Sequence, residues 1–254
     1  MKIELLPSTI GDPAARQFCI GTLINDIIAI DAGTLGLVWP LERQKQIQHV
    51  VLSHAHIDHI ATLPLFLDNV YAIGDQCPNV FGSNETCRVL RDHIFNDQVW
   101  PDFLRLSSKE TPFLTLQTME EEIPFSLGAL TLLPVALNHI VPSLGFLVSD
   151  HEGTVGFVSD TAPTERIWSL LSNVKRLKAV FLECSFPASQ NMLAENSGHL
   201  CSTSFKKELE KLDRSVPVIA CHLKPVFFDE ITEELRSINR TNIEVGVPGQ
   251  TYTF

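Results

Sequence analysis

The sequence predicts an α/β protein in which β-sheets are covered by helices. Apolar runs of four to eight residues recur along the chain without the alternation of half-exposed strands. Such continuous runs are typical of sheets that are covered on both faces. Amphipathic patterns at helical spacing lie between them. Strands and helices interleave in two comparable halves of one 254-residue domain, with a seam near residue 125.

The strands are expected at the apolar runs, in chain order at residues 26–30, 50–53, 79–82, 130–137, 144–149, 155–159, 179–183 and 216–221. Helical patterns occur at residues 60–67, 86–95, 164–171, 204–212 and 229–238. The pattern at 204–212 follows a Ser-Thr-Ser cluster, which is a signal for a helix N-cap. Residues 96–124 have no such pattern and form either an insertion that overhangs a site or packs a dimer, or an ordinary surface excursion.

Composition narrows the class of protein. Hydrophobic residues make up 44% of the chain, which is enough for a real core. The net charge of −11 comes without a basic stripe, so a long nucleic acid is an unlikely partner. The N-terminus lacks a signal-like apolar core, and no apolar run approaches the roughly 20 residues that span a bilayer. We therefore expect a soluble cytoplasmic protein without a membrane partner.

The most informative stretch of the chain is Ser-His-Ala-His-Ile-Asp-His at residues 53–59. His54 and His56 lie two residues apart, so an extended backbone points both rings to one side. Asp58 and His59 follow at once. Four ligand-type side chains within six positions are enough nitrogen and oxygen donors for two neighbouring metal ions.

A His-x-His-x-Asp-His motif after an apolar strand resembles the metallo-β-lactamase superfamily of dinuclear metal hydrolases. Four further sites match the superfamily's pattern in order, each at the end of a strand-like run: Asp31, His139 after Asn138, Asp160 and His222. The resemblance covers nearly the whole chain. It implies a four-layer αββα sandwich with two mixed sheets, flanked by helices, and ligands gathered at one edge of the sheets.

The resemblance also implies a ligand set for two divalent ions, most often Zn²⁺, with Mn²⁺ or Fe as alternatives. The first ion would be held by His54, His56 and His139. The second would be held by Asp58, His59 and His222, with Asp160 bridging both. Asp31 would orient ligands through hydrogen bonds. Two cations about 3.5–4 Å apart can clamp the attacking and leaving oxygens of an in-line displacement.

The C-terminal third narrows the class of hydrolase. Glu183-Cys184-Ser185-Phe186, then Gly198-His199-Leu200 and an amphipathic helix, resemble the class II cyclic-nucleotide phosphodiesterases. The resemblance implies hydrolysis of a 3′,5′-cyclic nucleotide such as cAMP or cGMP to the 5′-monophosphate by hydroxide formed on the metals. The candidate catalytic residues are Asp58, His199, which would protonate the leaving oxygen, and Glu183, which would orient His199.

Several alternatives stay open at this stage. A tRNA 3′-processing endonuclease shares Asp160-Thr161 and a similar glutamate block, but it carries His where this chain has Leu182, and a basic arm that is not visible here. A thioester hydrolase shares the histidine motif. A non-enzymatic nucleotide binder is less consistent with seven intact ligand candidates. His56 in place of Glu disfavours redox di-iron relatives, and Asp160 in place of Cys disfavours a true β-lactamase. A homodimer is a weak expectation from relatives.

Overall fold

The computed structural model describes residues 1–9, 17–74, 76–212 and 215–254. Its contacts divide the chain into two compact units. The first unit comprises residues 2–120 and 248–253, and the second comprises residues 1, 121–247 and 254. The chain therefore passes from one unit to the other at Glu120–Glu121, and its last strand returns to the first unit. That both units form a single domain stays a prediction.

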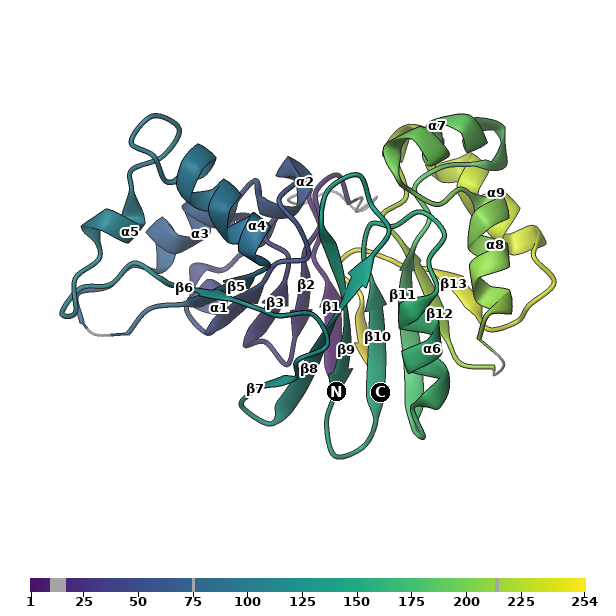
Figure 1. Cartoon of the computed structure of the whole chain (residues 1–254), viewed down its shortest axis with the longest axis horizontal. Coiled ribbons are helices and arrows are strands. Elements are labelled where there is room, and N and C mark those ends of the chain that lie inside the picture. Colours follow the sequence, from purple (N-terminus) through teal and green to yellow (C-terminus); the bar gives the residue numbers. More distant parts are fainter. Residues whose placement is uncertain (10–16, 75, 213–214) are drawn as a thin grey trace. The chain divides into compact units, whose positions relative to one another are not determined.

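The first unit is built on a seven-stranded mixed sheet with the order β14-β1-β2-β3-β4-β5-β6. The pairs from β3 to β6 are parallel, whereas β14, β1, β2 and β3 pair antiparallel. The strands are β1 Lys2–Leu5, β2 Thr22–Ile24, β3 Ile28–Ile30, β4 His49–Val51, β5 Asn79–Gly82, β6 Thr115–Thr118 and β14 Thr251–Thr253. Figure 1 labels all of them except β4 and β14.

Short helices connect these strands: η1 Leu35–Leu37, α1 Leu41–Gln44, α2 Ile57–Ile60, α3 Leu63–Val70, α4 Asn84–Val89, the π-helical turn η2 Leu90–Ile94 and α5 Phe103–Leu106. The core of the unit gathers residues from the sheet and from α3, including Val50, Leu63 and Phe66. The helix expected at 60–67 is two separate helices, because the chain leaves helical geometry at Thr62 and Pro64 opens the first turn of α3.

One further expectation in this unit needs correction. The strand expected at 26–30 begins at Ile28, because Asn25 and Asp26 both have positive φ angles, of 50° and 62°. Asn and Asp adopt positive φ more readily than most residues. Asn25 and Asp26 occupy the centre of a turn that the Ile27 N–H closes onto the Ile24 carbonyl at 3.2 Å, within the three-residue connection from β2 to β3. The segment 96–124, whose role the sequence left open, supplies α5 and the edge strand β6, which pairs with β5.

The second unit is built on another seven-stranded mixed sheet, with the order β13-β12-β11-β10-β9-β8-β7. The pairs from β10 to β13 are parallel, and those from β7 to β10 are antiparallel. The strands are β7 Phe125–Leu127, β8 Leu130–Leu137, β9 Ser143–Ser149, β10 Thr154–Val158, β11 Leu177–Glu183, β12 Val218–Cys221 and β13 Ile243–Val245. Strand β10 is buried throughout, as its continuous apolar run indicates.

The helices of this unit are α6 Arg166–Asn173, η3 Ala188–Gln190, α7 Asn191–Ser197, α8 Ser202–Glu210, η4 Pro225–Phe227 and α9 Phe228–Ser237. Helix α8 starts two residues earlier than expected. Its N-cap is Cys201, which exchanges hydrogen bonds with Ser204 in a capping box. The Ser-Thr-Ser cluster thus forms the first turn of the helix, and Phe205 and Leu209 pack into the core.

None of the helices in the described ranges combines the length and the apolar character that crossing a membrane requires. The expected cytoplasmic location stays a prediction.

Candidate metal centre

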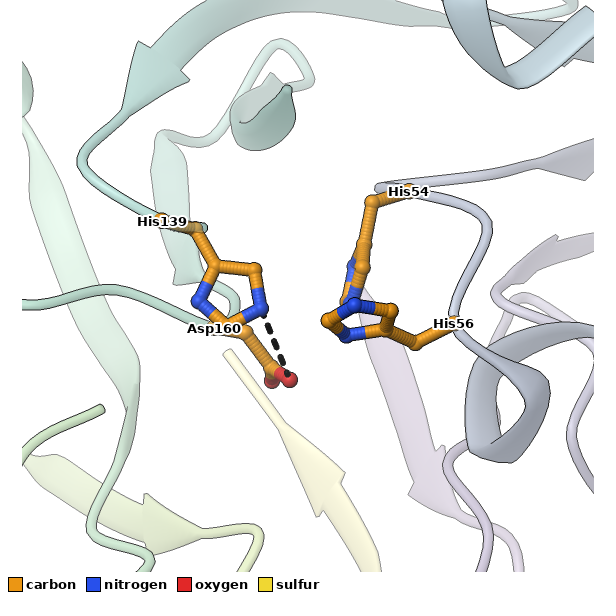
Figure 2. A group of neighbouring side chains, drawn as sticks. All are labelled: His54, His56, His139 and Asp160. Carbon is orange, nitrogen blue, oxygen red and sulfur yellow. Dashed lines mark ion pairs between the residues drawn. The ribbon is translucent and has the colours of Figure 1, made fainter. Parts of the chain in front are cut away.

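The histidine motif of the first unit lies immediately after β4. His56 has extended backbone angles and precedes α2, so Asp58 and His59 fall in the first and last turns of that helix. The rings of His54 and His56 are 4.6 Å apart, and those of His54 and His59 are 4.1 Å apart, measured between centroids. The Asp58 carboxylate lies 3.9 Å from Nε2 of His59. The four candidate ligands of this unit are therefore gathered in one place; Figure 2 draws two of them, His54 and His56.

The buried carboxylate of Asp31 forms hydrogen bonds with this group of residues. Asp31 Oδ2 lies 2.8 Å from Nδ1 of His59, and because a carboxylate only accepts, the ring nitrogen donates. Asp31 also accepts from the backbone N–H of Ser53 at 2.8 Å and from its hydroxyl at 2.8 Å. The orienting contact expected of Asp31 is therefore present. A ring whose Nδ1 is held in this way presents Nε2, which is the usual arrangement of metal-binding histidines.

The backbone around Asp31 is shaped to make these contacts. Asp31 has a φ of 62°, which is uncommon for a residue with a side chain and marks a strained position. Gly33, two residues on, abuts the turn that carries Asp58. A Cβ at Gly33 would lie 1.9 Å from the Asp58 carbonyl oxygen, so only glycine fits. The Ala32 N–H also donates to the His59 carbonyl at 2.7 Å.

The second unit gathers another group at the ends of the strands β8, β10 and β12. Asp160 follows β10, His222 follows β12, and His139 follows β8. His222 Nε2 lies 3.4 Å from Asp160 Oδ1, and His139 Nε2 lies 4.0 Å from Asp160 Oδ2. The latter pair is dashed in Figure 2. Each oxygen of one carboxylate thus faces a different histidine, which is the arrangement that a bridging ligand needs.

These donors suit a divalent metal ion. Two ligands of a tetrahedral Zn²⁺ with bonds of 2.0–2.1 Å are about 3.3 Å apart, close to the His222–Asp160 distance. The Nδ1 atom of His139 donates to the Gly198 carbonyl at 2.7 Å, and Nδ1 of His222 lies 2.9 Å from the Ser185 hydroxyl. Both rings therefore turn Nε2 toward Asp160. The chemistry of this donor set, imidazole and carboxylate, fits zinc, manganese or iron.

His199 and Glu183 lie beside this group. His199 Nδ1 is 2.9 Å from Glu183 Oε1 and 3.9 Å from Asp160 Oδ2. Glu183 is 1% exposed and also accepts from the Thr161 backbone N–H at 2.9 Å. One ligand-type atom each from Asp160, His199 and His222 lies within 4.8 Å of the others. Glu183 therefore contacts the histidine that it is expected to orient, next to the proposed bridging carboxylate.

Burial adjusts two titratable groups near the candidate ligands. The pKa of His139 is lowered chiefly by burial, although the Gly198 carbonyl and the Asp160 charge act in the opposite direction. A neutral imidazole is the form that binds a metal. The pKa of the Cys19 thiol is raised, first by burial and then by the Asp58 charge. Cys19 is therefore a protonated thiol at neutral pH.

Sequence reasoning assigned no role to three residues that hold the site. Ser53 and Ser185 lie within the motifs quoted above, but the sequence did not reveal what their hydroxyls contact. The Ser53 hydroxyl contacts a histidine ring nitrogen in the first unit, and the Ser185 hydroxyl contacts one in the second. Gly198 has a φ of 71°, and its carbonyl accepts from His139. A Cβ at Gly198 would lie 2.9 Å from Nδ1 of His139, so glycine is required there as well. The sequence signal that could have indicated each serine was its position beside a motif residue.

The chain is similar to known proteins of the family that its motifs resemble. The sequence matches the family described as "Beta-lactamase superfamily domain" over residues 28–219. It is 29% identical to a probable 3′,5′-cyclic-nucleotide phosphodiesterase of Yersinia pestis over 219 residues, which cover 74% of this chain and 62% of that protein. It is 25% identical to 3′,5′-cyclic-nucleotide phosphodiesterase 1 of Saccharomyces cerevisiae, over 79% of this chain and 65% of that protein. The chain therefore spans a little under two thirds of these relatives.

Among solved structures, unliganded yeast PDE1 superposes with a TM-score of 0.79 at 20% identity, covering 98% of both chains. This likeness confirms the expected fold class, the metallo-β-lactamase α/β sandwich with two mixed sheets and flanking helices. The names of the relatives also agree with the subgroup that the Glu183 and His199 blocks resemble. With the family matched over most of its length, the chain belongs to the β-lactamase superfamily.

Proposed function

We propose that the chain is a metal-dependent phosphodiesterase that hydrolyses 3′,5′-cyclic nucleotides to 5′-monophosphates. The observation that carries the proposal is the Asp160 carboxylate, whose two oxygens each face Nε2 of a different histidine. A carboxylate placed in this way suits a bridge between two cations. The similarity to proteins named cyclic-nucleotide phosphodiesterase supports the substrate class.

The ligands proposed for this centre are those that the sequence resemblance implies. His54, His56 and His139 would hold one divalent ion, and Asp58, His59 and His222 the other, with Asp160 shared by both. Zn²⁺ is the first candidate, and Mn²⁺ or Fe are the alternatives. When bound, such ions neutralise the phosphodiester charge and lower the pKa of a water to about 7, which makes a nucleophile available at neutral pH.

The protein's own residues would handle the proton of the leaving group. His199 lies 3.9 Å from Asp160 and has its Nδ1 fixed by Glu183 at 2.9 Å, so its Nε2 edge is the candidate proton donor to the 3′ oxygen. A positioned acid contributes typically 10²- to 10⁴-fold. Replacing His199 with Ala should therefore lower kcat by about that factor while two ions remain bound. Near-normal turnover by a fully loaded His199→Ala protein would contradict this role.

The substrate class is tested by turnover of the purified, metal-loaded chain. We expect release of 5′-AMP from cAMP, or of 5′-GMP from cGMP, with Asp160→Ala as the blank. A precursor tRNA and a thioester serve as competing substrates in the same assay. Cleavage of the tRNA 3′ trailer without cyclic-nucleotide turnover would support an endonuclease instead. Two bound ions with tight nucleotide binding and no product would indicate a binding protein.

A further inference from the structure

Each unit contains one fully buried serine whose hydroxyl lies between a carboxylate and two histidine rings. In the first unit this serine is Ser53. Its Oγ is 2.8 Å from Asp31 Oδ2, 3.0 Å from His54 Nδ1 and 3.4 Å from His59 Nδ1. The same carboxylate oxygen accepts from His59 Nδ1 at 2.8 Å. The hydroxyl thus connects Asp31 with His54.

The second unit repeats this arrangement with other residues. Ser185 Oγ is 2.8 Å from Glu183 Oε2, 2.9 Å from His222 Nδ1 and 3.3 Å from His199 Nδ1. Glu183 in turn accepts from His199 Nδ1 at 2.9 Å. In both units the serine's backbone N–H donates to the same carboxylate, at 2.8 Å for Ser53 and 3.1 Å for Ser185.

The two arrangements are reached by different paths of the chain. Ser53 and His54 follow β4 together, and Asp31 reaches across from the neighbouring strand β3. Ser185 and Glu183 lie together at the end of β11, and the histidine is the residue that reaches across, from β12. In each unit the crossing residue has a positive φ, of 62° at Asp31 and 57° at His222. Two chain paths that arrive at one set of contacts indicate a shared chemical requirement.

The shared requirement is a histidine that donates a proton from Nδ1 to the serine oxygen. A serine hydroxyl has one proton, and in both units the short contact to a buried carboxylate takes it, because a carboxylate only accepts. The oxygen can then only accept from the second partner, so the histidine must donate from Nδ1. We propose that Ser53 and Ser185 are positioning residues that hold His54 and His222 in the Nδ1–H tautomer, which leaves Nε2 as the nitrogen able to bind a metal ion.

The consequence for metal binding rests on the proposed metal centre, although the tautomers do not. Partners of this kind typically change metal affinity 10- to 100-fold when they are replaced. Ser53→Ala should weaken the ion assigned to His54 by about that factor, and Ser185→Ala should weaken the ion assigned to His222. The two variants should therefore affect different steps of a two-step metal titration.

The first test uses the full chain without metal and labelled with ¹⁵N-histidine. Long-range ¹H–¹⁵N spectra distinguish the Nδ1–H from the Nε2–H tautomer of each ring, with His54→Gln and His222→Gln assigning the signals. We expect Nδ1–H for both rings in the parent protein. In Ser53→Ala only the His54 signal should move toward Nε2–H, and in Ser185→Ala only the His222 signal. An Nε2–H tautomer for both rings in the parent protein would overturn the proposal whatever the protein's activity.

The matched control is Ser202, which also combines a buried serine with a carboxylate. Its hydroxyl lies 2.5 Å from Glu234 Oε2. Ser202→Ala removes the same kind of bond and should leave the tautomers of His54 and His222 unchanged. Zn²⁺ titration against a chromophoric chelator then measures affinity. Equal weakening by all three alanine variants would show a general structural effect and would contradict the assignment.

Two conservative substitutions at each serine guard against loss of folding. Ser185→Thr and Ser53→Thr keep the hydroxyl, and Ser185→Cys and Ser53→Cys keep the size with a much weaker acceptor. Circular dichroism identifies the variants that fold. Among these, threonine should retain the Nδ1–H tautomer and cysteine should lose it. A cysteine variant with parent tautomers and parent metal affinity would sink the proposal, whereas parent tautomers without metal binding would sink only the proposed function.

Discussion

At the scale of single residues, the site depends on backbone positions that most side chains cannot occupy. Asp31 and His222 are held at positive φ, and each is the residue that crosses to the neighbouring strand. Strain of this kind costs on the order of 1–3 kcal/mol per residue and persists only where surrounding contacts enforce it. Gly33 is a further example, because the Asp58 turn packs directly on its Cα.

Gly33→Ala is predicted to lower the free energy of unfolding by about 3 kcal/mol, since the added methyl meets backbone atoms that cannot rotate away. The Cβ would lie 1.9 Å from the Asp58 carbonyl oxygen and 2.6 Å from the Ile20 nitrogen. Urea unfolding measures the change. The control is Gly128→Ala, where the φ is 59° but the space is open, so only about 1–2 kcal/mol is expected. Equal costs at the two positions would contradict the close approach.

At the scale of elements, a buried acid fixes one helix against another. Glu208 of α8 is 1% exposed. It accepts from Trp168 Nε1 at 2.7 Å and from the Thr164 backbone at 3.2 Å, and Lys211 lies 2.7 Å from its other oxygen. The contacts connect α8 with the start of α6 and with the loop that follows Asp160. The loop that follows Asp160 is thus held in place by a group outside the candidate site.

Glu208→Ala is predicted to cost about 3 kcal/mol of stability, because it leaves the buried Trp168 N–H and the Thr164 N–H without their acceptor. Glu208→Gln keeps the shape and one acceptor oxygen, so it should cost only about 1 kcal/mol. Thermal unfolding followed by tryptophan fluorescence measures both variants. If alanine and glutamine proved equally mild, Glu208 would be a peripheral residue and would not hold the loop in place.

At the scale of the whole molecule, the proposed ligands are divided between the two units. The first unit contributes His54, His56, Asp58 and His59, and the second contributes the remaining three. Each set is arranged by the sheet of its own unit. Asp31 accepts a hydrogen bond from His59, and Glu183 accepts one from His199. Because the ligands come together only in the folded chain, metal binding should be coupled to folding and add to the stability of the chain.

Metal removal tests this coupling. A ligand that binds only the folded state at 100 times its Kd stabilises by about 2.7 kcal/mol, which corresponds to about 5–10 °C in Tm for a chain of this size. We expect Zn²⁺ to raise the Tm of the chelator-treated protein by at least this much, as measured by calorimetry. Asp160→Ala should lose most of the gain. The same shift in Asp160→Ala as in the parent would mean that the ion binds elsewhere.

Much of the fold was predictable from sequence because the buried strands are continuous apolar runs. The strands β5 and β8 were expected at their observed bounds, 79–82 and 130–137. The sequence did not predict β1, β2, β6, β7, β13 or β14, which have only three or four residues each. Four of them, β6, β7, β13 and β14, are sheet edges, and their pairing depends on distant partners. The strand ends that carry the site were found through the motifs, whereas helix starts were shifted by capping choices that propensity does not reveal.

The candidate site was predictable as a set of residue types but not as a set of contacts. His54, His56 and His59 stand out by their spacing, which needs no tertiary information. The role of Ser185 depends on its hydroxyl meeting a ring that lies 37 positions further along the chain, at the end of a different strand. Such contacts follow from the register of parallel strands, which the sequence alone leaves undetermined.

The central claim, hydrolysis of a cyclic nucleotide at a two-ion centre, is tested most directly by one titration. Zn²⁺ or Mn²⁺ is added in known equivalents to the chelator-treated full chain while release of 5′-AMP from cAMP is followed and bound metal is counted. We predict turnover that rises until two ions are bound per chain and is absent in Asp160→Ala. Two bound ions without 5′-AMP, or undiminished turnover in Asp160→Ala, would contradict the account.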